Sequence, residues 1–286
     1  MFREVADRVF VARYPQWDVN VGLVLGRDGA FVIDTRASEV QGRAVFADIA
    51  RLTRSIIVRH VVNTHVHFDH TFGNASFEDV TIHAHDNVGR AIQDSAEQIK
   101  AAFAADKGGA PEYGYTAADV TDVLATQVRP PDCTFGSNAT IDLGDRVVTM
   151  THAGRGHTDG DIAVLVPDTD AMFLGDLIEE SANPSLGGDC WPYEWADTLT
   201  SHLNWIGERT VVVPGHGQPV DVDFVRRQQA ELDTIARVIR ERRLAGTSLA
   251  DAQREPDERL PYPLPQLAAA FARGWAQTDL PDPSHA

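Results

Sequence analysis

Cysteine is scarce in this sequence, and long apolar runs are absent. The 286 residues include only two cysteines, Cys133 and Cys190. Nothing requires these thiols to pair, and so few of them in a chain of this length are typical of a cytoplasmic protein. No apolar run reaches the roughly 18 residues of a membrane span. The first residues, Met1 to Arg8, carry charges where a signal peptide needs an apolar segment.

Basic side chains are also few relative to acidic ones. The chain has 25 Lys and Arg against 42 Asp and Glu, for a net charge of -17. Nucleic-acid backbones are bound by surfaces rich in Lys and Arg, so this balance argues against a nucleic-acid substrate. Motifs for a Ser/His/Asp triad and for a glycine-rich phosphate loop are missing as well. We therefore expect a small-molecule substrate and neither a nucleic-acid nor a membrane partner.

The composition that remains is that of an ordinary globular protein. Hydrophobic residues make up 43% of the chain and charged residues 23%. The length suits one large domain or two small ones. We find no independent second domain, repeat or low-complexity tract, and predict one domain over residues 1–286 with a C-terminal helical segment at about 221–278.

Hydrophobic periodicity divides the chain into β-rich and helical stretches. Short apolar runs predict strands at residues 8–14, 19–25, 30–34, 60–64, 80–83, 140–143, 146–152, 161–166, 171–174 and 210–213. Helical spacing predicts helices at residues 38–52, 86–105, 116–125, 195–206, 222–243 and 267–275. Ser38 is the predicted N-cap of the first helix. A Gly/Pro loop with two tyrosines occupies residues 107–115, and the acidic tail from Asp279 is expected to fray.

The most informative segment is His65-Val66-His67-Phe68-Asp69-His70. A strand would place His65 and His67 on one face, because side chains alternate along it. Asp69 and His70 would then lie where the strand breaks into a loop and turn back toward the same point. Imidazoles together with a carboxylate suit borderline divalent metals such as Zn²⁺.

Four further short motifs follow this segment or precede it, each behind an apolar run. They are Phe31-Val32-Ile33-Asp34, Gly156-His157-Thr158, Phe173-Leu174-Gly175-Asp176 and Pro214-Gly215-His216-Gly217. In this order the five motifs resemble those of the metallo-β-lactamase superfamily. The resemblance implies an α+β fold, the four-layer αββα sandwich, which the two β-rich halves with their helices match.

The same resemblance implies a site with two divalent metal ions. His65, His67 and His157 would hold the first ion, Asp69, His70 and His216 the second, and Asp176 would bridge them. We expect Zn²⁺, with Mn²⁺ or Fe²⁺ as alternatives. Water between two such ions loses a proton near neutral pH and becomes a nucleophile. Asp69 is the candidate proton shuttle, and Asp34 the candidate that orients a ligand by hydrogen bonding.

The remaining histidines are predicted to be structural. His83 and His85 repeat the His-x-His spacing, but no Asp-His pair follows them. His152 is expected near the site without binding metal. His60 and His202 are expected to be structural or solvated, and His285 lies in the tail.

Aromatic residues in the loops are candidates for a substrate pocket. They are Trp17, Phe68, Tyr113, Tyr115 and Trp191. Arg226, Arg227, Arg237 and Arg240 could recognise a glutathione thioester or could form a solvated helix face. The sequence leaves the substrate, the oligomeric state and the roles of the cysteines open.

The favoured function is hydrolysis of an ester, thioester, lactone or amide of a small molecule. With Asp at position 176 the motif resembles that of glyoxalase II, lactonases and related esterases, whereas many β-lactamases have Cys or Ser near this position. Class B β-lactamase activity and iron-dependent oxidative chemistry are the alternatives. A pseudo-enzyme that only binds a ligand would lack metal ligands, and the full set is present.

Overall fold

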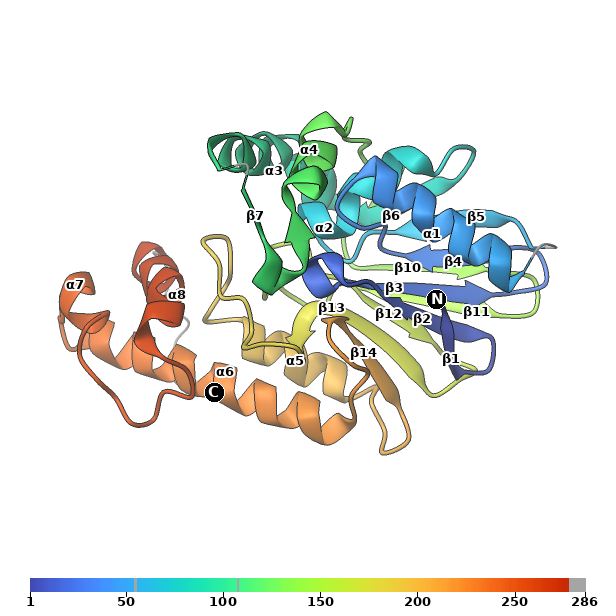
Figure 1. Ribbon diagram of the computed structural model, residues 1–286. Coiled ribbons are helices and arrows are strands. Elements are labelled where there is room, and N and C mark those ends of the chain that lie inside the picture. The colour runs from blue at the N-terminus through green and yellow to red at the C-terminus, as the bar shows by residue number, and fades with distance from the viewer. Residues whose placement is uncertain (54–55, 107, 278–286) are drawn as a thin grey trace.

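Two β-sheets face each other, and helices cover the outer face of each (Figure 1). The structure is a computed structural model that describes residues 1–53, 56–106 and 108–277. The first sheet has the order β1-β2-β3-β4-β5-β6-β9 and the second the order β10-β11-β12-β13-β14. This is the αββα arrangement that the sequence predicted.

The strands of the first sheet are antiparallel from β1 to β4 and parallel from β4 to β9. They are β1 (Arg3–Ala6), β2 (Val9–Arg13), β3 (Asn20–Leu25), β4 (Ala30–Ile33), β5 (Val58–Val62), β6 (Thr81–His85) and β9 (Cys133–Phe135). In the second sheet only β13 and β14 run parallel. Its strands are β10 (Asn138–Asp142), β11 (Val147–Thr151), β12 (Ala163–Val166), β13 (Ala171–Glu179) and β14 (Val211–His216).

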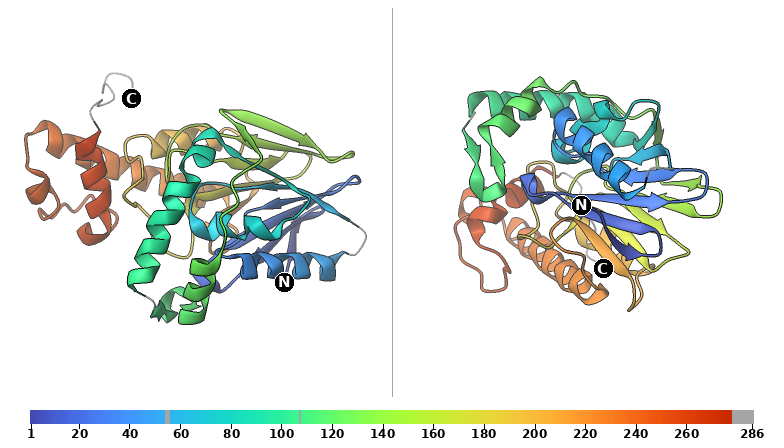
Figure 2. Two further views of the ribbon diagram at one scale, coloured as in Figure 1. Left: turned by 90° about the horizontal axis from the view of Figure 1, so that it is seen from above. Right: turned by 45° about the vertical axis from the view of Figure 1, so that its right-hand side comes forward.

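The helices lie on both outer faces and at one end of the sandwich. Those over the first sheet are α1 (Glu39–Leu52), α3 (Asp86–Ala105) and α4 (Ala117–Ala125). Those over the second sheet are α5 (Trp195–Leu203) and α6 (Val222–Leu244). The C-terminal helices α7 (Leu249–Ala252) and α8 (Leu264–Ala276) extend past the sheets at one side (Figure 2).

The helix boundaries agree with the sequence pattern where caps mark them. Ser38 accepts a hydrogen bond from the backbone N–H of Gln41 and starts α1, as predicted. Thr116 and Asp119 form a capping box that starts α4. Several short elements were not predicted, among them β1, β9 and α7, although Ser248 caps the start of α7. Residue 107, the tail from Asp279 and residue 278 at the end of the predicted helical segment lie outside the described residues.

Alternation along the strands builds separate apolar layers. Phe31 and Phe173 belong to the core between the two sheets, whereas Leu23 and Val61 face the helices over the first sheet. Gly22 leaves room for the ring of Phe173, because a Cβ there would lie 2.5 Å from it. The packed centre fixes how the two sheets stack, and so where their loops meet.

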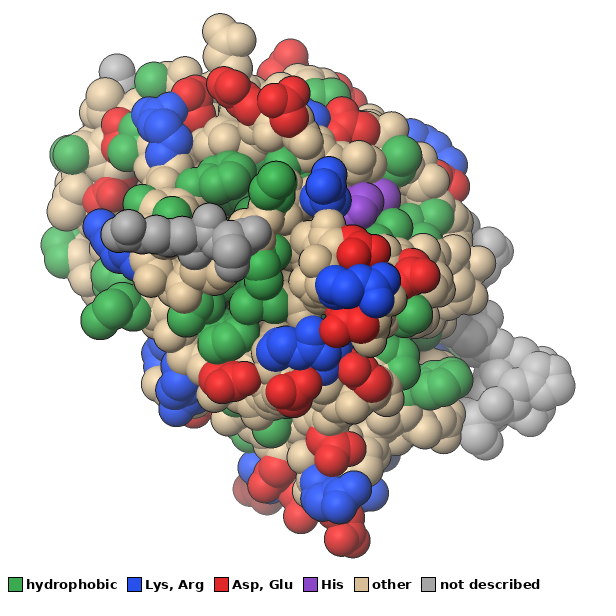
Figure 3. Space-filling view, turned by 90° about the vertical axis from the view of Figure 1, so that its right-hand side faces the viewer, with side chains coloured by type: hydrophobic (Ala, Val, Ile, Leu, Met, Phe, Trp, Pro, Cys, Tyr) green, Lys and Arg blue, Asp and Glu red, His purple; other side chains and the backbone are tan. Residues whose placement is uncertain are grey.

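Three further sequence expectations concern the surface charge, the two cysteines and the lack of a membrane-spanning helix. Basic side chains lie singly among acidic ones on the face in Figure 3, without a continuous basic patch. Cys133 is exposed and Cys190 is buried, and both thiols are free. Within the described ranges, no helix combines the length and the apolar character needed to cross a bilayer.

Candidate metal centre

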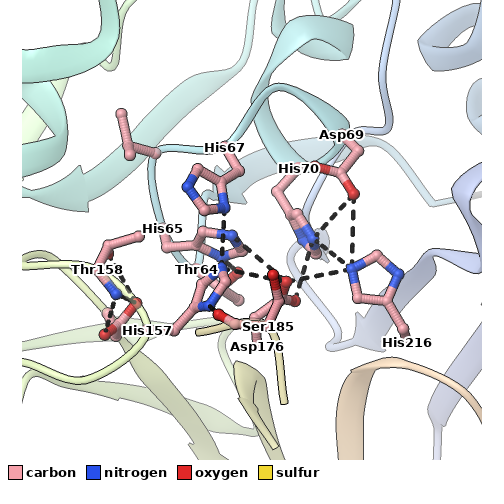
Figure 4. A network of polar contacts seen from close by, with 12 residues as sticks. Thr64, His65, His67, Asp69, His70, His157, Thr158, Asp176, Ser185 and His216 are labelled. Carbon is pink, nitrogen blue, oxygen red and sulfur yellow. Dashed lines mark hydrogen bonds and ion pairs between the residues drawn. The ribbon is translucent and has the colours of Figure 1, made fainter. Parts of the chain in front are cut away.

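Histidine and aspartate side chains from four segments of the chain converge on one point (Figure 4). The first group is His65, His67 and His157, whose ligand atoms lie within 4.8 Å of one another and of Asp176. His67 Nδ1 is 2.8 Å from His157 Nε2. These three side chains are the ones that the resemblance assigned to the first metal.

The second group is Asp69, His70 and His216, with ligand atoms again within 4.8 Å of one another. His70 Nε2 is 3.3 Å from His216 Nε2, and Asp69 Oδ2 is 3.5 Å from the same atom. These are the side chains that the resemblance assigned to the second metal.

Asp176 lies between the two groups (Figure 4). Its Oδ1 is 3.2 Å from His70 Nε2, and its Oδ2 is 3.4 Å from His157 Nε2. Burial opposes ionisation of this carboxyl, but the imidazoles of His216, His70 and His65 outweigh it and hold its pKa well below the usual range. An ionised carboxylate in contact with both groups is the geometry that a bridging ligand needs.

The local structure that presents His65 and His67 differs from the prediction. Strand β5 ends at Val62, so the expectation that a strand carries both histidines on one face is wrong. The backbone N–H of Thr64 donates to Asp34 Oδ1 at 2.8 Å instead of extending the sheet ladder. The chain then enters the one-turn helix α2 (Phe68–Thr71), with His67 at its N-cap.

Asp69 and His70 therefore lie on a helical turn and not in an irregular loop. The short 3₁₀ helix η2 (Phe72–Ser76) continues this turn. On the other sheet, the N–H and the hydroxyl of Thr158 both donate to Asp161, at 2.9 and 2.7 Å, which fixes the loop that carries His157.

Every imidazole of the centre uses one ring nitrogen for a hydrogen bond directed away from the other ligands. The acceptors are Thr64 Oγ1 for His65 Nδ1 (3.1 Å), Asp189 Oδ2 for His67 Nε2 (2.8 Å), Asp34 Oδ2 for His70 Nδ1 (2.8 Å), Ser185 O for His157 Nδ1 (3.0 Å) and Trp17 O for His216 Nδ1 (2.7 Å). Such bonds fix the tautomer and leave a lone pair on the opposite nitrogen.

The inward nitrogens fit a cation better than they fit one another. With both rings neutral, two lone pairs would face each other at 2.8 Å between His67 Nδ1 and His157 Nε2. His65 Nε2 is buried and has no hydrogen-bond partner among the described residues. A buried ring nitrogen with an unpaired lone pair is unfavourable, and coordination of a divalent metal ion would satisfy that lone pair.

Protonation differs among the imidazoles, and in the first group, against the opposing effect of burial, Asp189 raises the pKa of His67. Burial lowers the pKa of His65 well below its usual value and that of His157 to about 4, which keeps both rings neutral, as ligands must be. Burial opposes protonation of His216 too, but Asp176 outweighs it and raises the pKa of His216 to about 10. A metal entering the second group must therefore displace a proton.

The two predicted catalytic aspartates occupy different positions. Asp34 is 2% exposed and accepts from the Thr64 hydroxyl and from His70 Nδ1, both at 2.8 Å. It is placed to orient ligands and not to touch substrate. The Asp69 side chain is 12% exposed, and its Oδ2 lies 3.5 Å from His216 Nε2.

Two acidic residues next to the centre were not predicted. Glu179 is buried, and its carboxylate lies within 4.8 Å of the ligand atoms of Asp176 and His216. Burial raises the pKa of Glu179 to about 7. Asp189 contacts His67 from a loop. No local motif marks either residue, because Glu179 meets His216 through the pairing of β13 with β14 and Asp189 meets His67 through a loop contact.

The other described histidines lie apart from these ligand groups. His83 Nε2 is 3.1 Å from His60 Nδ1, and His85 stacks on His152 at 3.9 Å between ring centroids. His152 Nδ1 donates to the backbone O of Asp161. His202 is 1% exposed on α5 and so is not solvated. Among the described residues, the clusters of side chains that could hold a metal ion include none of these histidines.

The predicted pocket aromatics separate into three environments. Trp17, in the 3₁₀ turn η1 (Gln16–Asp18), stacks on Tyr115 at 4.7 Å and meets Phe68 edge-on at 5.3 Å. Tyr113 is 66% exposed. The guanidinium groups of Arg155 and Arg273 both lie over the ring of Trp191, at 3.6 and 4.8 Å from its centre.

The turn that holds Trp17 packs against a small hairpin. Strands β7 (Gly109–Ala110) and β8 (Tyr115–Thr116) flank the 3₁₀ turn η3 (Pro111–Tyr113). A Cβ on Gly114 would lie 1.9 Å from the backbone O of Pro15, so only glycine permits this close approach.

Two of the arginines that could recognise a glutathione thioester have partners on their own helix. On α6, Arg226 and Arg237 form ion pairs with Asp223 and Asp233.

Comparison with known proteins agrees with this geometry. The family model described as the metallo-β-lactamase superfamily matches residues 14–244. The chain is 28% identical over 175 residues to the human acyl-coenzyme A thioesterase MBLAC2, covering 57% of this chain and 59% of that protein. It is 30% identical over 83 residues to the Bacillus cereus metallo-β-lactamase type 2, covering 28% and 32%. The chain thus spans less than two thirds of the length of these relatives.

A solved structure shows the same fold. The DIM-1 metallo-β-lactamase superposes with a TM-score of 0.62 at 19% identity, over 82% of this chain and 96% of that one. The predicted αββα sandwich is confirmed. Because the family model covers most of the chain and the named relatives are hydrolytic enzymes, the protein belongs to the metallo-β-lactamase superfamily.

Proposed function

We propose that the protein is a dinuclear metallohydrolase that cleaves the acyl bond of a small thioester, ester, lactone or amide. The observation that carries this proposal is the position of Asp176 between two groups of three ligands each. Two divalent ions bound there would polarise a carbonyl and activate a water molecule. Zn²⁺ suits this donor set first, with Mn²⁺ or Fe²⁺ as alternatives.

The protein's own side chains would supply orientation and proton transfer. Asp34 and Thr64 hold His70 and His65 in fixed tautomers. Asp69 Oδ2 lies 3.5 Å from His216 Nε2, where Asp69 would move a proton to a leaving group. Glu179 adds a further carboxylate beside His216.

An apolar wall next to the second ligand group supports an acyl or aromatic substrate. Trp17 packs against Phe68, Phe103 and Tyr115, and its backbone O accepts the hydrogen bond from His216. The apolar wall is therefore adjacent to the candidate metal ligand His216. Among the acyl compounds we favour a thioester, because the thioesterase relative matches a longer part of the chain than the β-lactamase does.

A substrate panel tests this function. Acyl-CoA thioesters, aryl esters, lactones and a β-lactam are given to protein of measured metal content, and turnover is followed for each. We expect the acyl thioester to be hydrolysed fastest, and chelation of metal to abolish all turnover. His83→Ala, which changes a histidine outside both ligand groups, serves as the matched control for His216→Ala.

The outcomes separate the candidates. Preference for the β-lactam would favour the β-lactamase alternative, for which the Bacillus cereus relative speaks. Fully loaded protein that turns over none of these carbonyl compounds would refute the proposal. A cytoplasmic location and a small-molecule substrate stay predictions.

A further inference from the structure

The loop from Glu180 to Glu194, between β13 and α5, supports two ligands of the first metal group. The backbone O of Ser185 accepts from His157 Nδ1 at 3.0 Å, and Asp189 Oδ2 accepts from His67 Nε2 at 2.8 Å. These contacts leave His157 Nε2 and His67 Nδ1 directed at each other. The loop therefore influences the donor atoms of the first group without contributing a ligand.

Asp189 is the more important of these supports, because His67 is the least enclosed ligand of its group. The His67 side chain is 28% exposed, against 1% for His65 and 2% for His157. Packing alone holds a partly exposed imidazole poorly. A carboxylate on Nε2 fixes the tautomer and the ring orientation, and makes Nδ1 a stronger donor to a metal.

The chain on either side of Asp189 is anchored at different distances. On the upstream side Leu186 is buried, but Gly187 and Gly188 separate it from Asp189, and a Cβ on Gly188 would meet nothing within 4 Å. On the downstream side the adjacent Cys190 is fully buried, and Trp191 N–H donates to the backbone O of Gly156 at 2.8 Å. The nearer anchor of Asp189 is therefore on the downstream side.

A residue of the C-terminal helix holds that downstream side. Arg273, on α8, donates from Nε to the backbone O of Cys190 at 3.0 Å. Its guanidinium lies 4.8 Å from the ring centre of Trp191, and that of Arg155 lies 3.6 Å from it. Both planar cations thus contact the Trp191 ring, and each such contact contributes about 0.5–2 kcal/mol.

We propose that Arg273, acting through Cys190 and Trp191, positions Asp189, and that Asp189 in turn orients His67 as a metal ligand. This inference rests on the proposed dinuclear centre. It makes α8, which lies beyond the matched residues 14–244, a determinant of metal affinity at the first group. Asp189 and Arg273 are positioning residues, since they act through His67.

Zinc affinity, measured by competition with a chromophoric chelator, is the direct readout. For Asp189→Ala we expect the affinity of the first site to fall about 10–100-fold, as for other losses of a carboxylate behind a ligating histidine. Asp189→Asn keeps an acceptor for His67 Nε2 but removes the charge, so its loss should be smaller. The affinity of the second site should not change in either variant.

Arg273→Ala should weaken the first site in the same direction and by less. Arg273→Lys keeps the charge but loses the planar group over Trp191, and covers the case in which the alanine variant fails to fold. Arg254→Ala is the control, because Arg254 is a 74% exposed arginine of the same C-terminal segment. Its zinc affinity should equal that of the wild type.

A double-mutant cycle separates positioning from general loosening of the fold. If Arg273 acts through Asp189, the zinc effect of Arg273→Ala or Arg273→Lys disappears once Asp189 is alanine. Additive effects, or unchanged affinity in Asp189→Ala, would overturn the proposal. Wild-type protein that binds fewer than two zinc ions would instead refute the dinuclear centre itself, so the two failures are distinguishable.

Discussion

Four of the five imidazoles of the candidate metal centre depend on an acceptor from another part of the chain, and His65 uses the neighbouring Thr64. Asp34 serves His70 directly and His65 through the hydroxyl of Thr64. Two further acceptors are backbone oxygens, of Trp17 and Ser185. The position of a backbone oxygen depends on the fold and not on the side chain, which explains why these supports leave no mark in the residue types.

The first prediction concerns which histidines hold metal. His65→Ala and His216→Ala each remove a donor from a buried group, so metal content should fall from about two ions per chain to about one or fewer, with nearly all activity lost. Elemental analysis of gently purified protein measures this. His83→Ala should keep the full content, and loss of metal in that variant would mean that the ligands are assigned wrongly.

The second prediction concerns the charge of Asp176. Asp176→Asn keeps the shape of the side chain but offsets the repulsion between two cations less well. We expect metal affinity at one site to fall about 10–100-fold, with a larger loss in kcat than in substrate binding. Metal is titrated into stripped wild type and variant while turnover is followed. Equal occupancy and equal rates in both would exclude a bridging role.

The sequence placed the seven candidate donors because their motifs are local. His65, His67, Asp69 and His70 fall within six residues, and His157, Asp176 and His216 each follow an apolar run. Asp189 and Glu179 have no such pattern, since their relation to the centre arises only when loops and strands pack. The prediction of a strand through His67 was wrong because the backbone N–H of Thr64 donates to Asp34 Oδ1 and does not continue the sheet.

At the scale of elements, parallel strands β13 and β14 bring Asp176 and His216 together. Gly175 pairs with Pro214 in register, and Glu179 with His216. Long amphipathic elements such as α3 and α6 could be predicted to within a residue or two, because their apolar spacing is sustained. The short elements β1 and β9 and the one-turn helix α2 are set by tertiary contacts, which local pattern does not encode.

The third prediction follows from the close approach of these two strands. A Cβ on Gly215 would lie 1.8 Å from Asp176 Oδ1, so Gly215→Ala must displace the carboxylate. We expect weaker metal binding, and a loss of about 1–3 kcal/mol in the free energy of unfolding. Metal titration and urea unfolding measure the two effects. Gly207→Ala is the control, because its nearest contact would be at 3.8 Å, and an equal response of both variants would contradict the argument.

At the scale of the whole molecule, buried neutral histidines make stability depend on pH. His202 on α5 is 1% exposed, and its Nε2 has no hydrogen-bond partner among the described residues. Burial, helped by the neighbouring His152, lowers the pKa of His202 to about 4 from a usual value of 6.5. The unfolded chain therefore binds a proton at a higher pH than the folded chain does.

The fourth prediction gives this linkage its sign. The contribution of His202 is fully present above pH 6.5 and is lost as the pH falls toward about 4. Wild type should lose on the order of 1 kcal/mol per pH unit more than His202→Gln over this window. Urea unfolding at several pH values, with and without chelator, measures the difference. Parallel curves for the two proteins between pH 6.5 and 4 would show that His202 does not carry the effect.

The C-terminal helices share a hydrophobic core with the second sheet. Phe271 and Leu267 on α8 are fully buried in one cluster with Ile239 on α6 and Leu174 on β13. Because this core is continuous, we propose that the described chain is one cooperative domain and does not consist of a sandwich with an independent appendage.

The fifth prediction tests that cooperativity. Phe271→Ala removes a fully buried ring and should cost about 3–5 kcal/mol. Tryptophan fluorescence and far-UV circular dichroism should then shift together in urea as a single transition, because the lost contacts belong to the core that supports β13 and β14. Arg254→Ala, at an exposed position of the same segment, should stay within about 0.5 kcal/mol of wild type. An early partial transition in Phe271→Ala that leaves the main one unmoved would instead mark α7 and α8 as a separate unit, and would also remove the structural basis for an influence of α8 on the metal centre.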